Sequence, residues 1–77
     1  MRVMPISEMT VGEKGVVRTI TAKGLLRERL LELGVVAGTH ICCERFSPSG
    51  TASIYEVRSA RLVIRHCDGK HVLAEVY

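Results

Sequence analysis

The sequence predicts a small, mainly β domain with one short helix. Five stretches of β-branched or alternating apolar residues are separated by turns that contain glycine, proline or serine, which is typical of short antiparallel strands. One stretch after the first of these instead repeats leucines at helical spacing. At 77 residues, we expect a single domain, residues 1–77, whose five strands curl into a barrel.

The chain opens with a segment of little periodicity that leads into the first strand. Ser7 can cap a single helical turn that Gly12 ends. Residues 15–21 are rich in Val, Ile and Thr and are predicted to form the strand. Gly12 and Gly15 also fit the Gly-x-x-Gly shape of a loop that clamps a nucleic-acid backbone, but a turn before the strand explains both glycines better.

The helix is predicted between the first and second strands. Leu26, Leu30 and Leu33 recur at i, i+4 and i+7, so they share one face that can be buried. Gly34 follows, and glycine readily adopts the left-handed conformation that commonly ends a helix.

Four more strands are predicted after the helix. They are residues 39–46, 53–58, 61–65 and 71–76, and the Ser-Pro-Ser-Gly segment 47–50 has the composition of a hairpin loop. Alternation fixes which side chains point inward. The inward set comprises Ile41, Cys43, Tyr55, Val57, Leu62, Ile64, Val72, Ala74 and Val76.

Cysteine content and hydropathy favour a cytosolic location. The three cysteines are odd in number and two are adjacent, so we expect free thiols rather than a disulfide framework. The chain has neither an apolar run that could span a membrane nor the features of a signal peptide. Its net charge of +3 could suit an anionic partner, but basic and acidic residues are interspersed along the chain.

Three segments closely resemble the ferrous iron transport protein A (FeoA) family. These are Val-Gly-Glu-Lys-Gly-Val-Val at 11–17, Arg-Leu-Leu-Glu-Leu-Gly-Val-Val-Ala-Gly-Thr at 29–39 and Arg-Leu-Val-Ile-Arg at 61–65, and the likeness covers nearly the whole chain. The resemblance implies a small SH3-like barrel with a helix in an early loop. The sequence departs from the family pattern in the hairpin at 49–52 and at Ser59, where a glycine is common.

The resemblance also implies a function. It suggests a cytoplasmic accessory protein of bacterial ferrous iron uptake that binds the GTP-binding cytoplasmic region of the membrane transporter FeoB and modulates Fe(II) transport. It would reach the membrane only through that transporter. The resemblance implies no catalysis and no cofactor, and the sequence contains none of the common phosphate-loop, metalloprotease or nucleophile-elbow motifs. The sequence leaves open whether the chain also forms a weak homo-oligomer.

The residues suggest two kinds of site, a metal site and a protein-binding surface. The candidate metal ligands are His40, Cys42, His66 and Cys67, with His40 and Cys42 on one face of a strand. They lack the paired spacing of structural zinc sites, so ordinary thiols and imidazoles are the favoured interpretation.

The partner-binding candidates lie on the helix. Leu25 and Leu31 lie off the predicted buried stripe, and with Arg27 they are predicted to contact the partner. The alternative is that both leucines pack in the domain, or are exposed without a role.

The runner-up function is a small nucleic-acid-binding or transcription-regulator-like SH3 module. The same module forms the C-terminal domain of some iron-dependent repressors. The sequence contains only three aromatic side chains on which bases could stack, one of them predicted to point inward, which argues against this alternative.

Overall fold

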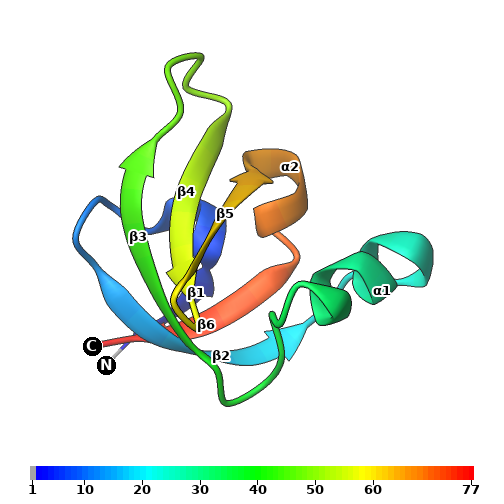
Figure 1. Ribbon diagram of the computed structural model, residues 1–77. Helices are drawn as coiled ribbons and strands as arrows, with labels where there is room; N and C mark the ends of the chain where they lie inside the picture. Colours follow the sequence, from blue (N-terminus) through cyan, green and yellow to red (C-terminus); the bar gives the residue numbers. More distant parts are fainter. Residues whose placement is uncertain (1) are drawn as a thin grey trace.

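The computed structural model describes residues 2–77 and contains one six-stranded antiparallel sheet, which curls around the core (Figure 1). The strand order is β1-β6-β2-β3-β4-β5. Along the chain the elements are β1 (Arg2–Pro5), the 3-10 helix η1 (Ile6–Glu8), β2 (Lys14–Ile20), α1 (Gly24–Glu32), β3 (His40–Phe46), β4 (Ala52–Val57), β5 (Ala60–Arg65), α2 (His66–Gly69) and β6 (Val72–Val76).

The predicted mainly β fold, with its one helix between the first two predicted strands, is confirmed. The number of strands is six rather than five, because residues 2–5 pair with β6, from Arg2 opposite Val76 to Pro5 opposite Leu73. Among the described residues, β1 and β5 are the two edges of the sheet, so hydrogen bonds do not close it into a complete barrel. A second helix, α2, forms one turn where the sequence predicted only a connection.

The core consists largely of the side chains that alternation predicted to point inward. Of the nine, all but Leu62 are buried, and Leu62 packs against the core half-buried. Further buried side chains are Val17 of β2 and, outside the strands, Ile6, Met9, Ala22, Leu30 and Val35. The predicted helical turn near Ser7 is η1, which places Ile6 in the core.

Gly12 and Gly15 have separate structural roles. Gly12 has a φ of 93°, a left-handed conformation that a side chain disfavours. Gly15 lies in β2, where a Cβ atom would come within 2.7 Å of the carbonyl oxygen of Glu75. Turn geometry and close strand packing therefore account for this Gly-x-x-Gly segment.

The helix α1 projects from the body of the domain (Figure 1). Gly34 follows it with a φ of 92°, as predicted for the helix end. The prediction of a buried Leu26–Leu30–Leu33 stripe is only partly right, because Leu30 is buried, Leu26 is half-buried and Leu33 is 44% exposed. Helical periodicity shows that residues share a face, but in this protein no described element covers the Leu33 end of that face.

Candidate protein-binding surface

Arg27 and Leu31 lie together on the side of α1 that faces the end of β2. Nη1 of Arg27 donates a hydrogen bond of 3.1 Å to the carbonyl oxygen of Ile20, which ties the helix to the strand. Leu31 follows one turn later, because residues four apart are neighbours on a helix. Arg27, Leu31 and Ile20 line a shallow cavity of about 250 Å³. The structure therefore places two of the three predicted contact residues on one surface.

Leu25 lies apart from that cavity. It is in the first turn of α1 and is 81% exposed, compared with 37% for Leu31. Six residues of helix separate the two leucines by about 9 Å along the axis and about 120° around it. A partner would have to extend over the N-terminal end of α1 to cover both.

A second hollow, which we call the α1–β5 groove, lies on another side of the helix. Its volume is about 400 Å³, and its apolar lining includes Leu26, Leu30, Leu33 and Val63. Val63 is 66% exposed in the middle of β5. Val63 was not predicted as a site residue, although an apolar side chain on the outward side of an alternating strand is a usable signal.

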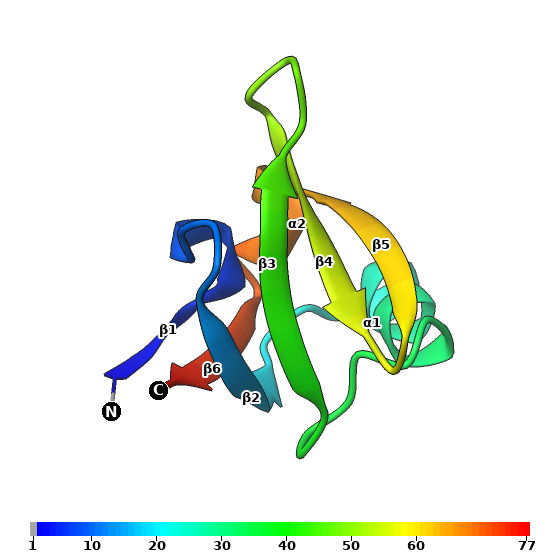
Figure 2. The same cartoon turned by 60° about the vertical axis from the view of Figure 1, so that its left-hand side comes forward.

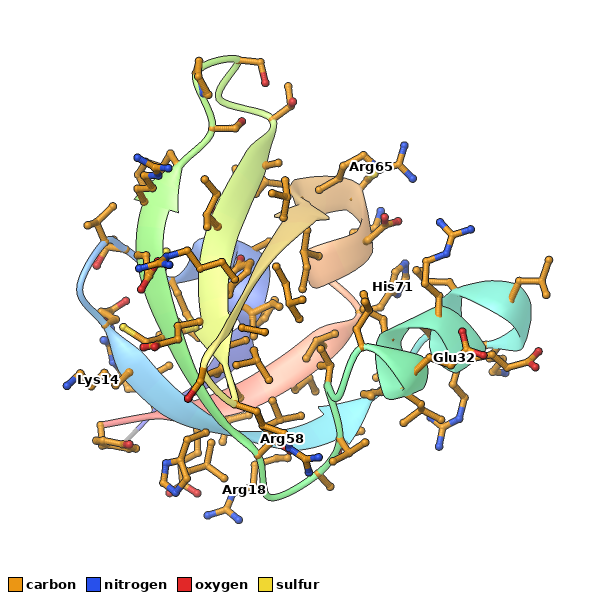
Figure 3. The ribbon with its side chains drawn as sticks, in the orientation of Figure 1. Lys14, Arg18, Glu32, Arg58, Arg65 and His71 are labelled. Carbon is orange, nitrogen blue, oxygen red and sulfur yellow. The ribbon has the colours of Figure 1, made fainter. Side chains whose placement is uncertain are left out.

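Two arginines add positive charge to this groove. Arg29 of α1 and Arg65 of β5 contribute to its lining. Arg65 forms an ion pair of 3.2 Å with Asp68 of α2. Its side chain projects outward from the end of β5 (Figure 3). Arg29 has no ion-pair partner among residues 2–77. The groove thus combines an apolar floor with an excess of basic groups.

The four candidate metal ligands fall into two separate pairs. His40 and Cys42 share the outer face of β3 and line an open basin with Lys14 and Glu56. Nδ1 of His40 lies 3.1 Å from the hydroxyl oxygen of Tyr77, within hydrogen-bonding distance.

The second pair, His66 and Cys67, lies on α2. Nε2 of His66 is 2.9 Å from the hydroxyl oxygen of Ser53, and Cys67 is exposed beside Asp68. In residues 2–77, no three His, Cys, Asp or Glu side chains are grouped so that they could hold a metal ion.

The three cysteines are free, as predicted. Cys43 is buried, and burial raises the pKa of its thiol, since a thiolate is poorly solvated in the core. Cys42 is partly exposed, and the burial of Cys43 agrees with its place in the predicted inward set.

The aromatic side chains do not form a platform for stacking bases. Tyr55 is fully buried. Phe46 and Tyr77 are exposed but lie near opposite ends of β3, since Tyr77 packs edge-on against His40 at the start of the strand. Seven residues of strand separate these ends by about 20 Å. This spacing argues against single-stranded nucleic acid as the ligand.

The sequence matches the family model described as the FeoA domain over residues 4–76. It matches none of the curated proteins. Within residues 2–77, the helices are all too short to cross a lipid bilayer.

Three solved structures share the fold at similar levels of identity. An iron uptake regulatory protein (FeoA) is 27% identical, with both chains covered in full and a TM-score of 0.88. A FeoA-like protein from Clostridium acetobutylicum is 26% identical, with 99% of this chain and 88% of that chain covered and a TM-score of 0.88.

The third is FeoA of Stenotrophomonas maltophilia in complex with zinc. It is 26% identical, with 94% of this chain and 89% of that chain covered and a TM-score of 0.82. That protein is described as an SH3 domain protein that possibly acts as a ferrous iron transport activating factor. The small SH3-like fold expected from the sequence is confirmed by this likeness.

Proposed function

This chain belongs to the FeoA family, and on that basis we propose that it is a cytoplasmic accessory protein of bacterial ferrous iron uptake. It binds the GTP-binding cytoplasmic region of a FeoB-type transporter and modulates Fe(II) transport without chemistry of its own. The FeoA domain match over residues 4–76 is the observation that carries this proposal. The role described for the Stenotrophomonas maltophilia protein, of similar size and fold, supports it.

The exposed side chains of α1 support a protein partner. Leu25 and Leu31 leave apolar surface accessible on a helix that projects from the domain, with charged residues around it. Apolar groups within a polar rim are typical of protein interfaces. Burial of two such leucines contributes about 2–4 kcal/mol to an association.

Arg27 supports the same surface in a different way. Its hydrogen bond to Ile20 fixes the orientation of α1 relative to β2, so that Leu31 is held in place before a partner arrives. Such preorganisation lowers the entropic cost of binding. We therefore assign Leu25, Arg27 and Leu31 to the transporter contact.

The test measures binding to purified transporter. Full-length FeoB in lipid nanodiscs is immobilised, and the chain is titrated over it with GDP, with a non-hydrolysable GTP analogue and without nucleotide. We expect binding in at least one nucleotide state and its loss when the GTP-binding region is removed from the transporter. Absence of binding in all three states would overturn the proposal. Equal binding to the truncated transporter would exclude the GTP-binding region as the contact.

A further inference from the structure

The free edge of β5 exposes backbone hydrogen-bonding groups. The β4–β5 hairpin closes with Val57 opposite Ala60, and the ladder continues in register until the amide of His66 donates to the carbonyl oxygen of Thr51 at 2.9 Å. A two-residue hairpin loop is closed by a hydrogen-bonded pair, and such pairs then alternate along an antiparallel ladder. The backbone N–H and C=O groups of Leu62 and Ile64 therefore form hydrogen bonds with β4. Every second residue, Arg61, Val63 and Arg65, directs its N–H and C=O groups to the open side.

This edge strand is not short, bulged or interrupted by proline, three features that commonly protect an edge. It is six residues long, its register with β4 is continuous, and it contains no proline. An exposed apolar residue, Val63, lies at its middle. The opposite edge, β1, has only four residues and ends at Pro5. Natural edge strands are commonly short, bulged or interrupted by proline, so β5 is the edge that can accept another strand.

Space for such a strand exists beside β5. The α1–β5 groove is bordered by β5 on one side and by α1 on the other, and α1 lies on the β5 side of the sheet (Figure 2). Leu26 and Leu30 of α1 pack in the same cluster as Leu62 and Ile64. The helix thus forms an apolar wall on the inner side of the position that a seventh strand would take, about 4.8 Å beyond β5.

We propose that β5 binds an extended peptide segment, which adds a strand to the sheet in the α1–β5 groove. Strand addition of this kind uses main-chain hydrogen bonds for affinity and alternate side chains for specificity. The backbone groups of Arg61, Val63 and Arg65 bind the main chain of the segment.

The charge of the strand determines the composition of the segment. Residues on the outer side of the added strand face Arg65, Val63 and Arg61 in turn, so the segment carries an acidic, an apolar and an acidic residue at i, i+2 and i+4. The ion pairs of Arg61 with Glu44 and of Arg65 with Asp68 are exposed surface pairs, which exchange partners at little cost. Residues i+1 and i+3 face the α1 side of the groove, where Leu26 and Leu33 are the accessible apolar side chains, and are apolar.

A blocked peptide, acetyl-Ser-Glu-Leu-Val-Leu-Glu-Ser-amide, tests the proposal. Binding is measured by NMR titration, and amide hydrogen exchange is measured residue by residue. We expect the amides of Arg61, Val63 and Arg65 to exchange rapidly in the free protein and to be slowed about tenfold or more at saturation, as new hydrogen bonds protect them. Protection confined to other residues, or no binding at millimolar peptide, would overturn the proposal.

Two variants separate the backbone from the charge contribution. Val63→Pro removes an N–H that the added strand needs but β4 does not, and should weaken binding about tenfold. Arg61→Glu/Arg65→Glu should no longer bind the acidic peptide and should instead bind a version with lysine in place of both glutamates. Arg45→Glu, on β3, is the matched control and should bind the acidic peptide normally. Unchanged affinity in both test variants would overturn the proposal. If Val63→Pro proves unstable, the charge-reversed variant tests the proposal by itself, and its unchanged affinity for the acidic peptide would overturn it.

Discussion

The hydroxyl group of Tyr55 donates a hydrogen bond of 2.8 Å to the carbonyl oxygen of Ile6 in the buried core. This bond joins β4 to η1, two elements that lie 49 residues apart in the chain. Burial raises the pKa of Tyr55 to about 12, because the phenolate would be desolvated. The same carbonyl oxygen also accepts a hydrogen bond of 3.1 Å from the backbone N–H of Met9, so the Tyr55 hydroxyl supplies its second bond.

Tyr55→Phe should lower the free energy of unfolding by about 0.5–1.5 kcal/mol, since it removes one buried hydrogen bond and preserves the ring, while the Ile6 carbonyl keeps its bond from the Met9 N–H. Urea denaturation at pH 7 measures the change. Tyr77→Phe, at the exposed tyrosine, is the control and should change stability by less than about 0.5 kcal/mol.

The same tyrosine predicts a loss of stability at alkaline pH. A group whose pKa is raised on folding, here from 10 to about 12, stabilises the protein fully below its unfolded pKa and loses that contribution as the pH rises through the folded value. The wild-type protein should therefore lose stability between pH 10 and 12 more steeply than Tyr55→Phe. Parallel pH profiles of the thermal midpoint would contradict this assignment.

Glu13 predicts a loss of stability at acidic pH. Its carboxylate accepts a hydrogen bond of 2.8 Å from the backbone N–H of Thr10 and one of 2.9 Å from Arg2. The Thr10 N–H is the main cause that lowers the pKa of Glu13 below 4.5. A lowered pKa gives stability that is present above the unfolded value and is lost as the pH falls through the folded value.

Glu13→Gln should therefore flatten the decline of the thermal midpoint below pH 4.5 and lower the midpoint at neutral pH. Glu44→Gln is the matched control, because Glu44 also forms an arginine ion pair, 2.8 Å from Arg61, but accepts no backbone N–H in the described chain. Equal flattening by both substitutions would show that the Thr10 hydrogen bond is not the cause.

The strands were predictable from sequence because their pattern is local. Residues 15–21, for instance, are predicted as a strand, and β2 is Lys14–Ile20. Alternation also identified eight buried side chains of the later strands, but not Val17 of β2. The strand β1 was not predictable in this way, since its four residues, which end at Pro5, show little alternation, and their pairing depends on the open edge of β6.

The candidate site was only partly predictable for a related reason. The helical period of α1 shows that Leu26, Leu30 and Leu33 share a face, but not which element covers it. The structure covers Leu30 and leaves Leu33 at the groove. The role of Val63 in that groove depends on β5 being an edge strand, which is a property of the strand order and not of local sequence.

Ser59→Gly should stabilise the domain. Arg58 and Ser59 form the β4–β5 turn with φ values of 52° and 67°, the pattern of a type I′ turn, in which glycine is strongly favoured. A left-handed residue with a Cβ costs about 1–2 kcal/mol, so glycine at position 59 should raise the free energy of unfolding by about 0.5–1 kcal/mol after its greater unfolded-state entropy is subtracted. Ala60→Gly, one residue later in β5, should instead lower it, and a gain in both variants would contradict the turn argument.

The exposed leucines of α1 give the last prediction. Leu25→Ser/Leu31→Ser should retain the thermal midpoint of the wild type and weaken binding to the transporter, because both side chains are exposed in the free domain and each contributes about 1–2 kcal/mol when a partner covers it. Leu30→Ser should instead lower the midpoint, since it leaves a cavity in the core. Val11→Ser, an exposed apolar residue before β2, is the surface control and should change neither quantity. If the double variant binds normally, the contact lies elsewhere, and the hairpin at residues 47–52 becomes the next surface to substitute; if it unfolds, both leucines stabilise the domain itself.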